Sequence, residues 1–334
     1  MKTLIAHGPK DIRLEEAPDP DAGDGVLVRM ERGGICGSDL HYFNHGGFGT
    51  VRLREPMILG HEVSGRVISG PGFEGGERVA VSPSRPCRAC DYCAIGHQNH
   101  CLNMRFYGSA MPFPHIQGAF REILAADPAQ CIRADGLSAE EAAIAEPLAV
   151  VLHAAKQAGD LMGRRVLITG CGPIGLLAVL VARAAGALEI VATDLAPLPL
   201  KMAADLGAEA IAASGGALER FHADKGRFDV HFECSGAAVA LASAIPALKP
   251  RATLVQLGLG GDMTLPMQAM TAKEIILKGS FRFHGEFAEA VMMMQAGRID
   301  VSPLVTHVMP LADAVAAFET AGDRTQAIKV QLAF

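Results

Sequence analysis

Residues 165–187, RVLITGCGPIGLLAVLVARAAGA, decide the fold that we predict for this chain. The stretch opens with an apolar run typical of a buried strand and continues into an apolar run long enough for a helix. Gly170, Gly172 and Gly175, with Pro173 and Ile174 in the same turn, fit the pattern G-x-G-x-x-G at the junction. In that position the first glycine permits a tight turn, the second lets a diphosphate approach the backbone, and the third lets the helix pack on the sheet. The stretch therefore predicts a strand, a phosphate-binding turn and a helix of a dinucleotide-binding domain.

An acidic residue ends the strand that is expected next. Asp194 closes the run IVATD, about twenty residues beyond the glycines, where a carboxylate accepts hydrogen bonds from the adenosine ribose. A carboxylate there repels the 2′-phosphate of NADP, and the following residues, LAPLPLK, contain no arginine. We therefore expect NAD as the cofactor, with NADP as the first alternative and a glycine-rich turn without a nucleotide as the second.

The sequence around this stretch alternates between strand and helix. The strand candidates are RVLITG, EIVATD, FDVHFECSG, ATLVQLGLG and EIILKGSF. The helical stretches between them include IGLLAVLVARAAGA, PLPLKMAADLGA and AVALASAIPAL. Strands that alternate with helices of roughly ten to fifteen residues predict an α/β domain with a parallel, doubly wound sheet that is covered on both faces.

The flanking regions have a different pattern. Residues 1–135 contain short β-rich runs separated by glycine and proline, such as VLVRMERGGICG, EVSGRVISG and ERVAVSPS. The next stretch, GLSAEEAAIAEPLAVVLHAAKQAG, is helical and begins with the capping-box pair Ser138 and Glu141. The residues from GEFAEAVMMMQAGRID onward predict two more helices and a last strand, AIKVQLAF, which can return to the first domain.

Composition excludes several classes of protein. The chain has 334 residues, of which 50% are hydrophobic and 20% charged, and these values fit a globular protein of two domains. The net charge of -6 argues against a nucleic-acid-binding surface. No apolar run approaches the ~20 residues of a membrane helix, and the apolar stretch at the N-terminus is too short for a signal peptide. We therefore expect a cytoplasmic protein without a membrane or nucleic-acid partner.

Four of the eight cysteines lie in one short lobe, residues 85–102. They are Cys87, Cys90, Cys93 and Cys101, with the spacing C-x2-C-x2-C-x7-C. Disulfides are rare in the cytoplasm, and four thiolates can enclose a zinc ion completely, so this pattern predicts a structural zinc site. A disulfide or redox cluster is the alternative.

A second group of residues could hold a metal with an open coordination position. GGICGSDLHYF contains Cys36, MILGHEVSG contains His61 and Glu62, and AEPLAVVLHAA contains Glu146. A catalytic zinc has about three protein ligands and one exchangeable position. A thiolate, an imidazole and a carboxylate from this group meet that requirement.

These stretches carry a resemblance. GGICGSDLHYF, PMILGHEVSG, the four-cysteine lobe, EPLAV and GCGPIG occur in this order, and with them the chain resembles the zinc-containing medium-chain dehydrogenases, within that family the polyol dehydrogenases. The resemblance covers nearly the whole chain. It implies a GroES-like catalytic domain of residues 1–147 plus 285–334, with a Rossmann NAD-binding domain of residues 148–284 inserted between them. It also implies two zinc ions per chain and a homo-oligomer, most often a tetramer.

The resemblance assigns roles to the second group. Cys36 and His61 would bind the catalytic zinc, and the third protein ligand would be Glu62 or Glu146, which the sequence does not distinguish. Zinc would polarise a substrate hydroxyl, and hydride would pass to the nicotinamide ring.

A serine and a histidine that follow Cys36 could carry the proton released from the substrate. Ser38 would accept the departing proton first, and His41 would release it, because histidine titrates near neutral pH.

The resemblance also narrows the choice of substrate. The stretch KGSFRFHGEF places Arg282 where polyol dehydrogenases have a substrate-contacting arginine. The stretches GSFRF, RFYGSAM and FPH are most similar to the corresponding stretches of the enzymes that interconvert L-idonate and 5-keto-D-gluconate. A guanidinium group can bind the carboxylate of a sugar acid through two hydrogen bonds. The further substrate-binding candidates are Phe283, Tyr42, Phe106 and His115. The alternatives are a neutral polyol such as sorbitol or xylitol, threonine, or a simple secondary alcohol, and in another class a non-catalytic nucleotide-binding protein.

Overall fold

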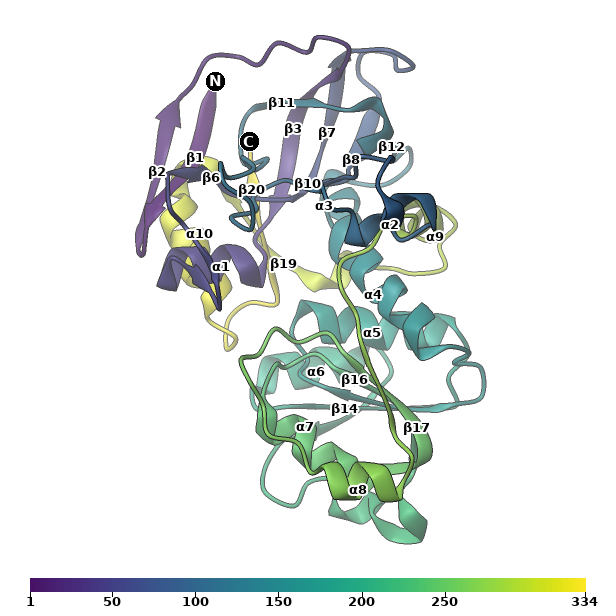
Figure 1. Ribbon diagram of the computed structural model, residues 1–334. Coiled ribbons are helices and arrows are strands. Elements are labelled where there is room, and N and C mark those ends of the chain that lie inside the picture. The colour runs from purple at the N-terminus through teal and green to yellow at the C-terminus, as the bar shows by residue number, and fades with distance from the viewer. The chain divides into compact units, whose positions relative to one another are not determined.

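The computed structural model describes residues 1–334 and divides into two compact units (Figure 1). The first unit comprises residues 1–149, 284–323 and 329–334, and the second comprises residues 150–283 and 324–328. The short return of residues 324–328 to the second unit has no signal in the sequence pattern. It brings Arg324 into the nucleotide-binding unit.

The first unit is built on a seven-stranded sheet. Its strands run in the order β12 (Cys131–Arg133), β8 (Arg78–Val81), β7 (Glu62–Ser69), β3 (Val26–Gly34), β20 (Lys329–Ala333) and β19 (Val305–Pro310), and β11 (Ile123–Ala126) also pairs with β3. The β7, β3 and β20 strands are consecutive neighbours, so β20 lies beside β3, a strand from the first part of the chain. Gly34 pairs with Glu62 on one side and with Gln331 on the other.

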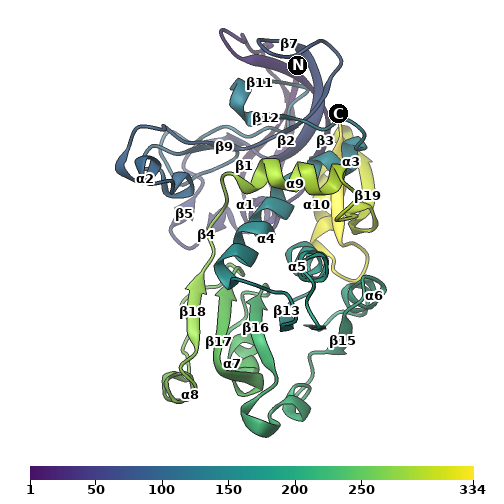
Figure 2. The ribbon, with the colours of Figure 1, turned by 90° about the vertical axis from the view of Figure 1, so that its right-hand side faces the viewer.

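Smaller sheets and several helices complete this unit. The smaller sheets contain β2 (Asp11–Glu16), β1 (Lys2–Gly8) and β6 (Met57–Ile58), then β10 (Arg105–Phe106) with β9 (Ser84–Arg85), and β4 (Gly47–Phe48) with β5 (Val51–Arg52). The helices are α1 (Gly37–His45), α2 (Asp91–Ala94), α3 (Ala139–Ala143), α9 (Glu286–Gln295) and α10 (Ala314–Gly322). In Figure 2, α2 lies on a lobe that extends to the side of this unit.

The stretch that we expected to be helical after residue 135 forms two helices. The Ser138 side chain accepts a hydrogen bond from Glu141 N, and the Glu141 carboxylate accepts one from Ser138 N, so the predicted capping box starts α3. This helix ends at Ala143 with Ile144 as its C-cap, and α4 (Ala145–Ala158) begins at the next residue. The break has a physical reason, since Pro147 has no N–H group and its ring would collide with the carbonyl of residue 143 in a continuous helix.

The second unit contains a six-stranded sheet in which every pair of neighbours is parallel. Its strands run in the order β15 (Glu209–Ala212), β14 (Glu189–Asp194), β13 (Arg165–Thr169), β16 (Phe228–Glu233), β17 (Leu248–Gln256) and β18 (Ile276–Gly279). All five strands expected from the alternation are present. The sixth, β15, was missed because it is short and only partly buried.

Helices cover both faces of this sheet. They are α5 (Pro173–Ala184), α6 (Pro197–Asp205), α7 (Ala238–Ala244) and α8 (Met267–Ala272). Figure 1 shows α5 and α6 on one face and α7 on the other. The core beneath α7 is formed by apolar side chains that include Leu167, Val191, Phe228 and Leu254. The predicted parallel, doubly wound α/β domain is confirmed, and the chain has no helix long and apolar enough to cross a membrane.

Candidate functional site

The first unit brings Cys36, His61 and Glu62 together. Each offers one ligand atom, and these atoms lie within 4.8 Å of one another. Cys36 is the N-cap of α1 and Glu62 is the first residue of β7, so the ends of two elements position the three side chains. His61 Nδ1 is buried without a hydrogen-bond partner. Buried polar atoms nearly always have a partner, so this nitrogen is consistent with a site that holds a metal ion. A thiolate, an imidazole and a carboxylate are the donor set of a catalytic zinc.

Asp39 supports this cluster, although the sequence analysis gave this residue no role. Its carboxylate is completely buried and accepts hydrogen bonds from the backbone N–H groups of Cys36, at 3.0 Å, and Gly60, at 3.2 Å. His61 Nδ1 lies 3.9 Å from the same carboxylate. Asp39 therefore fixes the two segments that carry the thiol and the imidazole. The signal was present, because Asp39 is the third residue of a helix whose N-cap is Cys36.

A buried lysine also contacts the cluster. Lys329, the first residue of β20, is 2% exposed, and its ammonium group forms an ion pair with Oε2 of Glu62. The same group donates a hydrogen bond to Ile35 O at 3.0 Å. Burial lowers the pKa of Lys329, but the negative charges of Glu62 and Cys36 outweigh burial, so this pKa lies above its usual value.

Glu146 is buried close to the same group but is not among the residues within 4.8 Å. Its pKa is raised to about 8, mainly by burial; the charge of His61 lowers this pKa, those of Glu62 and Cys36 raise it, and that of Lys329 lowers it. Burial also raises the pKa of the Cys36 thiol to about 12. A divalent cation at the cluster would reverse these shifts, because it stabilises thiolates and carboxylates.

Ser38 and His41 are one turn apart on α1 and therefore lie on the same side of the helix. Both are half-buried. Burial, followed by repulsion from His45, lowers the pKa of His41 below its usual value. A neutral His41 can accept a proton at neutral pH.

Three of the expected substrate-binding residues belong to the first unit. The Phe106 ring lies 5.7 Å from the His61 ring, centre to centre. Tyr42 is buried, and its hydroxyl accepts a hydrogen bond from Ala110 N at 3.1 Å. In His115, Nε2 is 2.9 Å from Arg54 N and Nδ1 is 3.0 Å from Pro112 O, so both ring nitrogens have main-chain partners. A role for His115 in substrate binding stays a prediction.

The other two expected substrate-binding residues belong to the second unit. Phe283 is completely buried. Arg282 is half-buried, has a positive φ of 55°, and places its guanidinium group 5.0 Å from the centre of the Phe281 ring. A bulky side chain with this backbone conformation is uncommon and often marks a functional constraint.

The four cysteines of the lobe also lie together, with all four sulfur atoms within 4.8 Å of one another. The sulfurs of Cys90 and Cys101 are 3.9 Å apart, far beyond the ~2.05 Å of a disulfide bond. The separation is close to the ~3.8 Å that a tetrahedral zinc with bonds of ~2.3 Å imposes on its sulfur ligands. Hydrogen bonds from the backbone of Ala89 and the side chain of Asn103 lower the pKa of Cys87 to about 6. The spacing of the sulfur atoms therefore favours zinc binding over a disulfide.

In the second unit, the glycine-rich turn joins β13 to α5. Gly170 has a φ of 86°, and a Cβ atom there would lie 2.8 Å from the Ser235 backbone. A Cβ on Gly175 would lie 1.8 Å from Gly170 O, whereas one on Gly172 would meet nothing within 4 Å. The first and third glycines are thus needed for close packing, and the second leaves the backbone open to a ligand at the N-terminus of α5.

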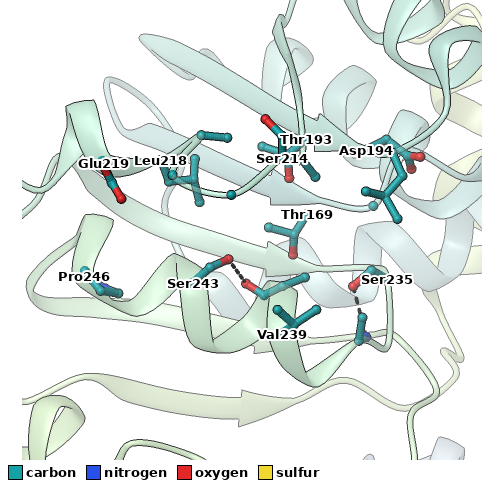
Figure 3. Close-up of a pocket in the computed structure, with 18 of the residues that line it drawn as sticks. Thr169, Thr193, Asp194, Ser214, Leu218, Glu219, Ser235, Val239, Ser243 and Pro246 are labelled. Carbon is teal, nitrogen blue, oxygen red and sulfur yellow. Dashed lines mark hydrogen bonds between the residues drawn. The ribbon is translucent and has the colours of Figure 1, made fainter.

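A cavity of about 400 Å³ opens beside this turn (Figure 3). Thr169, Asp194 and Ser235 line one part, and Leu218 and Pro246 line another. The Asp194 carboxylate accepts hydrogen bonds from Cys171 N at 2.7 Å and Ala196 N at 2.9 Å, so it also holds the turn in place.

Arg324 lines the same cavity and was missed by the sequence analysis. It brings a positive charge to a wall that the sequence predicted to be acidic. No signal could have identified it, because it reaches this unit only through the short return of residues 324–328.

Comparison with known proteins identifies the family. The chain matches the alcohol dehydrogenase GroES-like domain over residues 22–136 and the zinc-binding dehydrogenase domain over residues 173–296. It is 42% identical to L-idonate 5-dehydrogenase (NAD(P)(+)) of Escherichia coli (strain K12), over 100% of this chain and 98% of that protein. This chain belongs to the zinc-binding dehydrogenases. The dehydrogenase is also 36% identical to bovine sorbitol dehydrogenase, over 95% of this chain and 92% of the relative, which supports the polyol branch of the family.

Solved structures agree with this assignment. The dehydrogenase is similar to the crystal structure of L-idonate 5-dehydrogenase from Escherichia coli str. K-12 substr. MG1655, with a TM-score of 0.96, 41% identity, and coverage of 100% of this chain and 98% of that one. It is also similar to 2R,3R-butanediol dehydrogenase from Bacillus subtilis, with a TM-score of 0.89, 28% identity, and coverage of 100% and 99%. The predicted GroES-like and Rossmann folds are confirmed. So is the prediction of an oxidoreductase that uses zinc and a nicotinamide cofactor, and the non-catalytic alternative is set aside.

Proposed function

We propose that this dehydrogenase oxidises a secondary hydroxyl group of a sugar acid with NAD, and that L-idonate, converted to 5-keto-D-gluconate, is the substrate. The observation that carries the catalytic part is the buried group of Cys36, His61 and Glu62, with its unpaired His61 nitrogen. The full-length relative at 42% identity is named for L-idonate and supports the substrate. Relatives named for sorbitol, at 36% identity, make a neutral polyol the second candidate.

In this proposal Cys36, His61 and Glu62 bind the catalytic zinc, and Glu146 is the alternative carboxylate ligand. Zinc supplies Lewis-acid chemistry at the hydroxyl oxygen, and NAD accepts the hydride. Cys87, Cys90, Cys93 and Cys101 hold a second, structural zinc, which has no open position.

The residues of α1 move the proton. Ser38, beside Cys36, is the first acceptor for the hydroxyl proton, and His41 passes it on, because the lowered pKa of this histidine keeps it neutral and able to accept. Phe106 and Tyr42 provide apolar surface that excludes water from the substrate.

For the cofactor, Gly170, Gly172 and Gly175, with Pro173 and Ile174, form the diphosphate site. Asp194 favours NAD, because a 2′-phosphate would lie against its carboxylate. Arg324 lines the same cavity and offsets part of this repulsion. We therefore expect NAD to be preferred and NADP to be accepted more weakly.

The decisive experiment is a steady-state assay of the purified dehydrogenase with L-idonate, sorbitol, xylitol and L-threonine, each with NAD and with NADP. We expect the highest kcat/KM with L-idonate and NAD. If sorbitol or xylitol exceeds L-idonate by tenfold or more, the substrate is a neutral polyol. An Arg282→Ala variant should lose kcat/KM mainly with the acid, since the guanidinium group binds its carboxylate. An equal loss with sorbitol would assign Arg282 a structural role.

We also propose that the dehydrogenase is a homo-oligomer, with a tetramer as the expected state. The β18 strand supports this, because it is the edge of the parallel sheet and its Ile276 and Leu277 are 47% and 44% exposed. An exposed apolar edge strand offers unpaired backbone groups and apolar surface to which another chain can pair. Ile276→Glu should reduce the mass measured by light scattering, whereas Leu188→Glu, at an exposed site away from the sheet edge, should not. An Ile276→Glu variant of unchanged mass would show that β18 is not an interface.

A further inference from the structure

A lysine without access to solvent needs an explanation. Lys329 is 2% exposed and its partner Glu62 is 1% exposed. Removing both charges from water costs several kcal/mol per ion, and a buried ion pair on average contributes little net stability compared with apolar residues of similar size. Stability alone therefore does not account for an ammonium group at this position.

The sheet is shaped to bring this cation to Glu62. The β7 and β20 strands are not adjacent, because β3 lies between them. Gly34 ends β3 at the crossing point, where a Cβ atom would lie 2.2 Å from Glu62 Oε2 and 3.0 Å from Lys329 Cε. Any residue with a side chain would block the contact. The missing side chain of Gly34 is thus the gap through which the Lys329 ammonium reaches the carboxylate.

The ion pair uses one of the two oxygens of Glu62. Lys329 contacts Oε2, and its remaining hydrogen bond to Ile35 O holds the ammonium group at the base of the loop that leads to Cys36. A carboxylate that is held through one oxygen cannot rotate freely, so its other oxygen keeps a fixed direction.

We propose that Lys329 is a positioning residue for the catalytic metal, which holds Glu62 through Oε2 so that Oε1 is the single oxygen presented to zinc. The inference rests on the proposed function of Cys36, His61 and Glu62 as zinc ligands. It makes Glu62 the resident carboxylate ligand, because Glu146 lacks such a partner among the ion pairs and lies outside the close group of donor atoms.

Charge balance leads to the same role. With Cys36, Asp39, Glu62 and Glu146 ionised, the site would contain four negative charges, and zinc supplies only two positive ones. Lys329 supplies a third positive charge. Because an uncompensated buried charge is costly, the lysine reduces the excess negative charge that remains in the interior when zinc binds.

The test compares Lys329→Met with wild type in two measurements that do not depend on turnover. The first is the visible spectrum of protein that contains one zinc and one cobalt per chain, with cobalt exchanged into the more labile site. In Lys329→Met, Glu62 can bind with both oxygens, so we expect a weaker cobalt band typical of a higher coordination number. The second is the rate of release of that metal to a chromogenic chelator, which should rise at least about tenfold, as expected when an outer partner of a ligand is lost.

Two controls separate positioning from structure. Lys329→Arg keeps the positive charge and should restore the cobalt spectrum. Gln331→Met changes another buried residue of β20, whose side chain donates to Glu140 O and does not contact Glu62, and should leave both measurements at the wild-type value. A Lys329→Met protein with a lower melting temperature but an unchanged spectrum and release rate would overturn the proposal.

If Lys329→Met does not fold, the double variant Glu62→Gln/Lys329→Met removes both charges and keeps the proposal testable. Its metal release should match that of Glu62→Gln alone, because Lys329 acts through Glu62. Faster metal release from the double variant than from Glu62→Gln would overturn the inference, because it would show that Lys329 acts independently of Glu62. A wild-type chain that binds only one metal ion would instead contradict the proposed function, so the two failures are distinguishable.

Discussion

The buried carboxylate of Asp39 accepts hydrogen bonds from the segments that carry Cys36 and His61. With Lys329, it shows that the geometry of the proposed zinc site depends on residues that do not bind the metal. The sequence pattern identified Cys36, His61 and Glu62 because they stand in recognisable stretches. It did not identify Lys329, because its partner Ile35 is 294 residues away in the chain. A contact of that separation is visible only after folding.

Asp39→Asn should weaken the catalytic metal site while the cysteine lobe keeps its zinc. An amide can accept only through its oxygen, so one of the two backbone N–H groups would face an NH₂ group and lose its partner, at a cost of about 1–3 kcal/mol. Metal analysis after dialysis should fall from two zinc ions per chain towards one. Asp205→Asn, which alters an exposed carboxylate paired with Lys201, is the matched control. Two retained zinc ions in Asp39→Asn would contradict this role.

His231 predicts how stability changes with pH. It is completely buried on β16, its Nε2 is 2.9 Å from Thr169 Oγ1, and Nδ1 has no partner. Burial lowers its pKa to about 3. The unfolded chain therefore takes up a proton near pH 6.5 while the folded chain does not, and the free energy of unfolding falls as the pH drops from 6.5 towards 3, by up to about 1.4 kcal/mol per unit.

Chemical denaturation between pH 7.5 and 5 measures this effect. A His231→Gln variant should show a shallower decline than wild type over the same range. Parallel curves for the two proteins would mean that other groups control the acid response.

At the scale of single elements, the sequence predicted most boundaries where local signals were strong. The capping box of Ser138 starts α3 as expected, and the glycine-rich turn separates β13 from α5. The division between α3 and α4 at Ile144 was missed, because the apolar pattern continues through this point and the signal of Pro147 was not used. The short strand β15 was missed because it has only four residues and is only partly buried. Elements that depend on tertiary pairing are thus less predictable than those with their own start signals.

The cysteine lobe gives a prediction at this scale. It contains only α2 and short turns, so zinc provides most of its stability. Cys93→Ser should reduce the zinc content by one ion per chain and increase the rate of amide hydrogen exchange in residues 87–101, while β13 to β17 remain protected. The free thiol of Cys131, buried in another strand, provides the control Cys131→Ser. Unchanged exchange in the lobe would show that it folds without zinc.

At the scale of the whole molecule, the alternation of strands and helices was sufficient to predict the parallel sheet. It could not predict that residues 324–328 return to the nucleotide-binding unit, nor that β20 inserts between β3 and β19. Both arrangements arise from contacts between distant parts of the chain. Arg324 and Lys329, which lie on this last segment, were therefore absent from the predicted sites.

Truncation after Ile328 tests the importance of this arrangement. The shortened chain retains all segments of the second unit but loses β20, which joins two strands of the first unit. We expect NAD binding, measured by calorimetry, to remain within about threefold of wild type, while the catalytic zinc is lost from metal analysis. Retention of both zinc ions by the truncated chain would show that β20 is dispensable for the metal site.

The late position of Lys329 has a consequence for protein synthesis. Cys36, His61 and Glu62 emerge from the ribosome long before Lys329 is translated, and Gly34 can meet β20 only after that. The nascent chain thus carries the negatively charged ligands early and receives the positively charged lysine much later. Premature metallation during translation would occur in a different electrostatic setting from that of the finished enzyme.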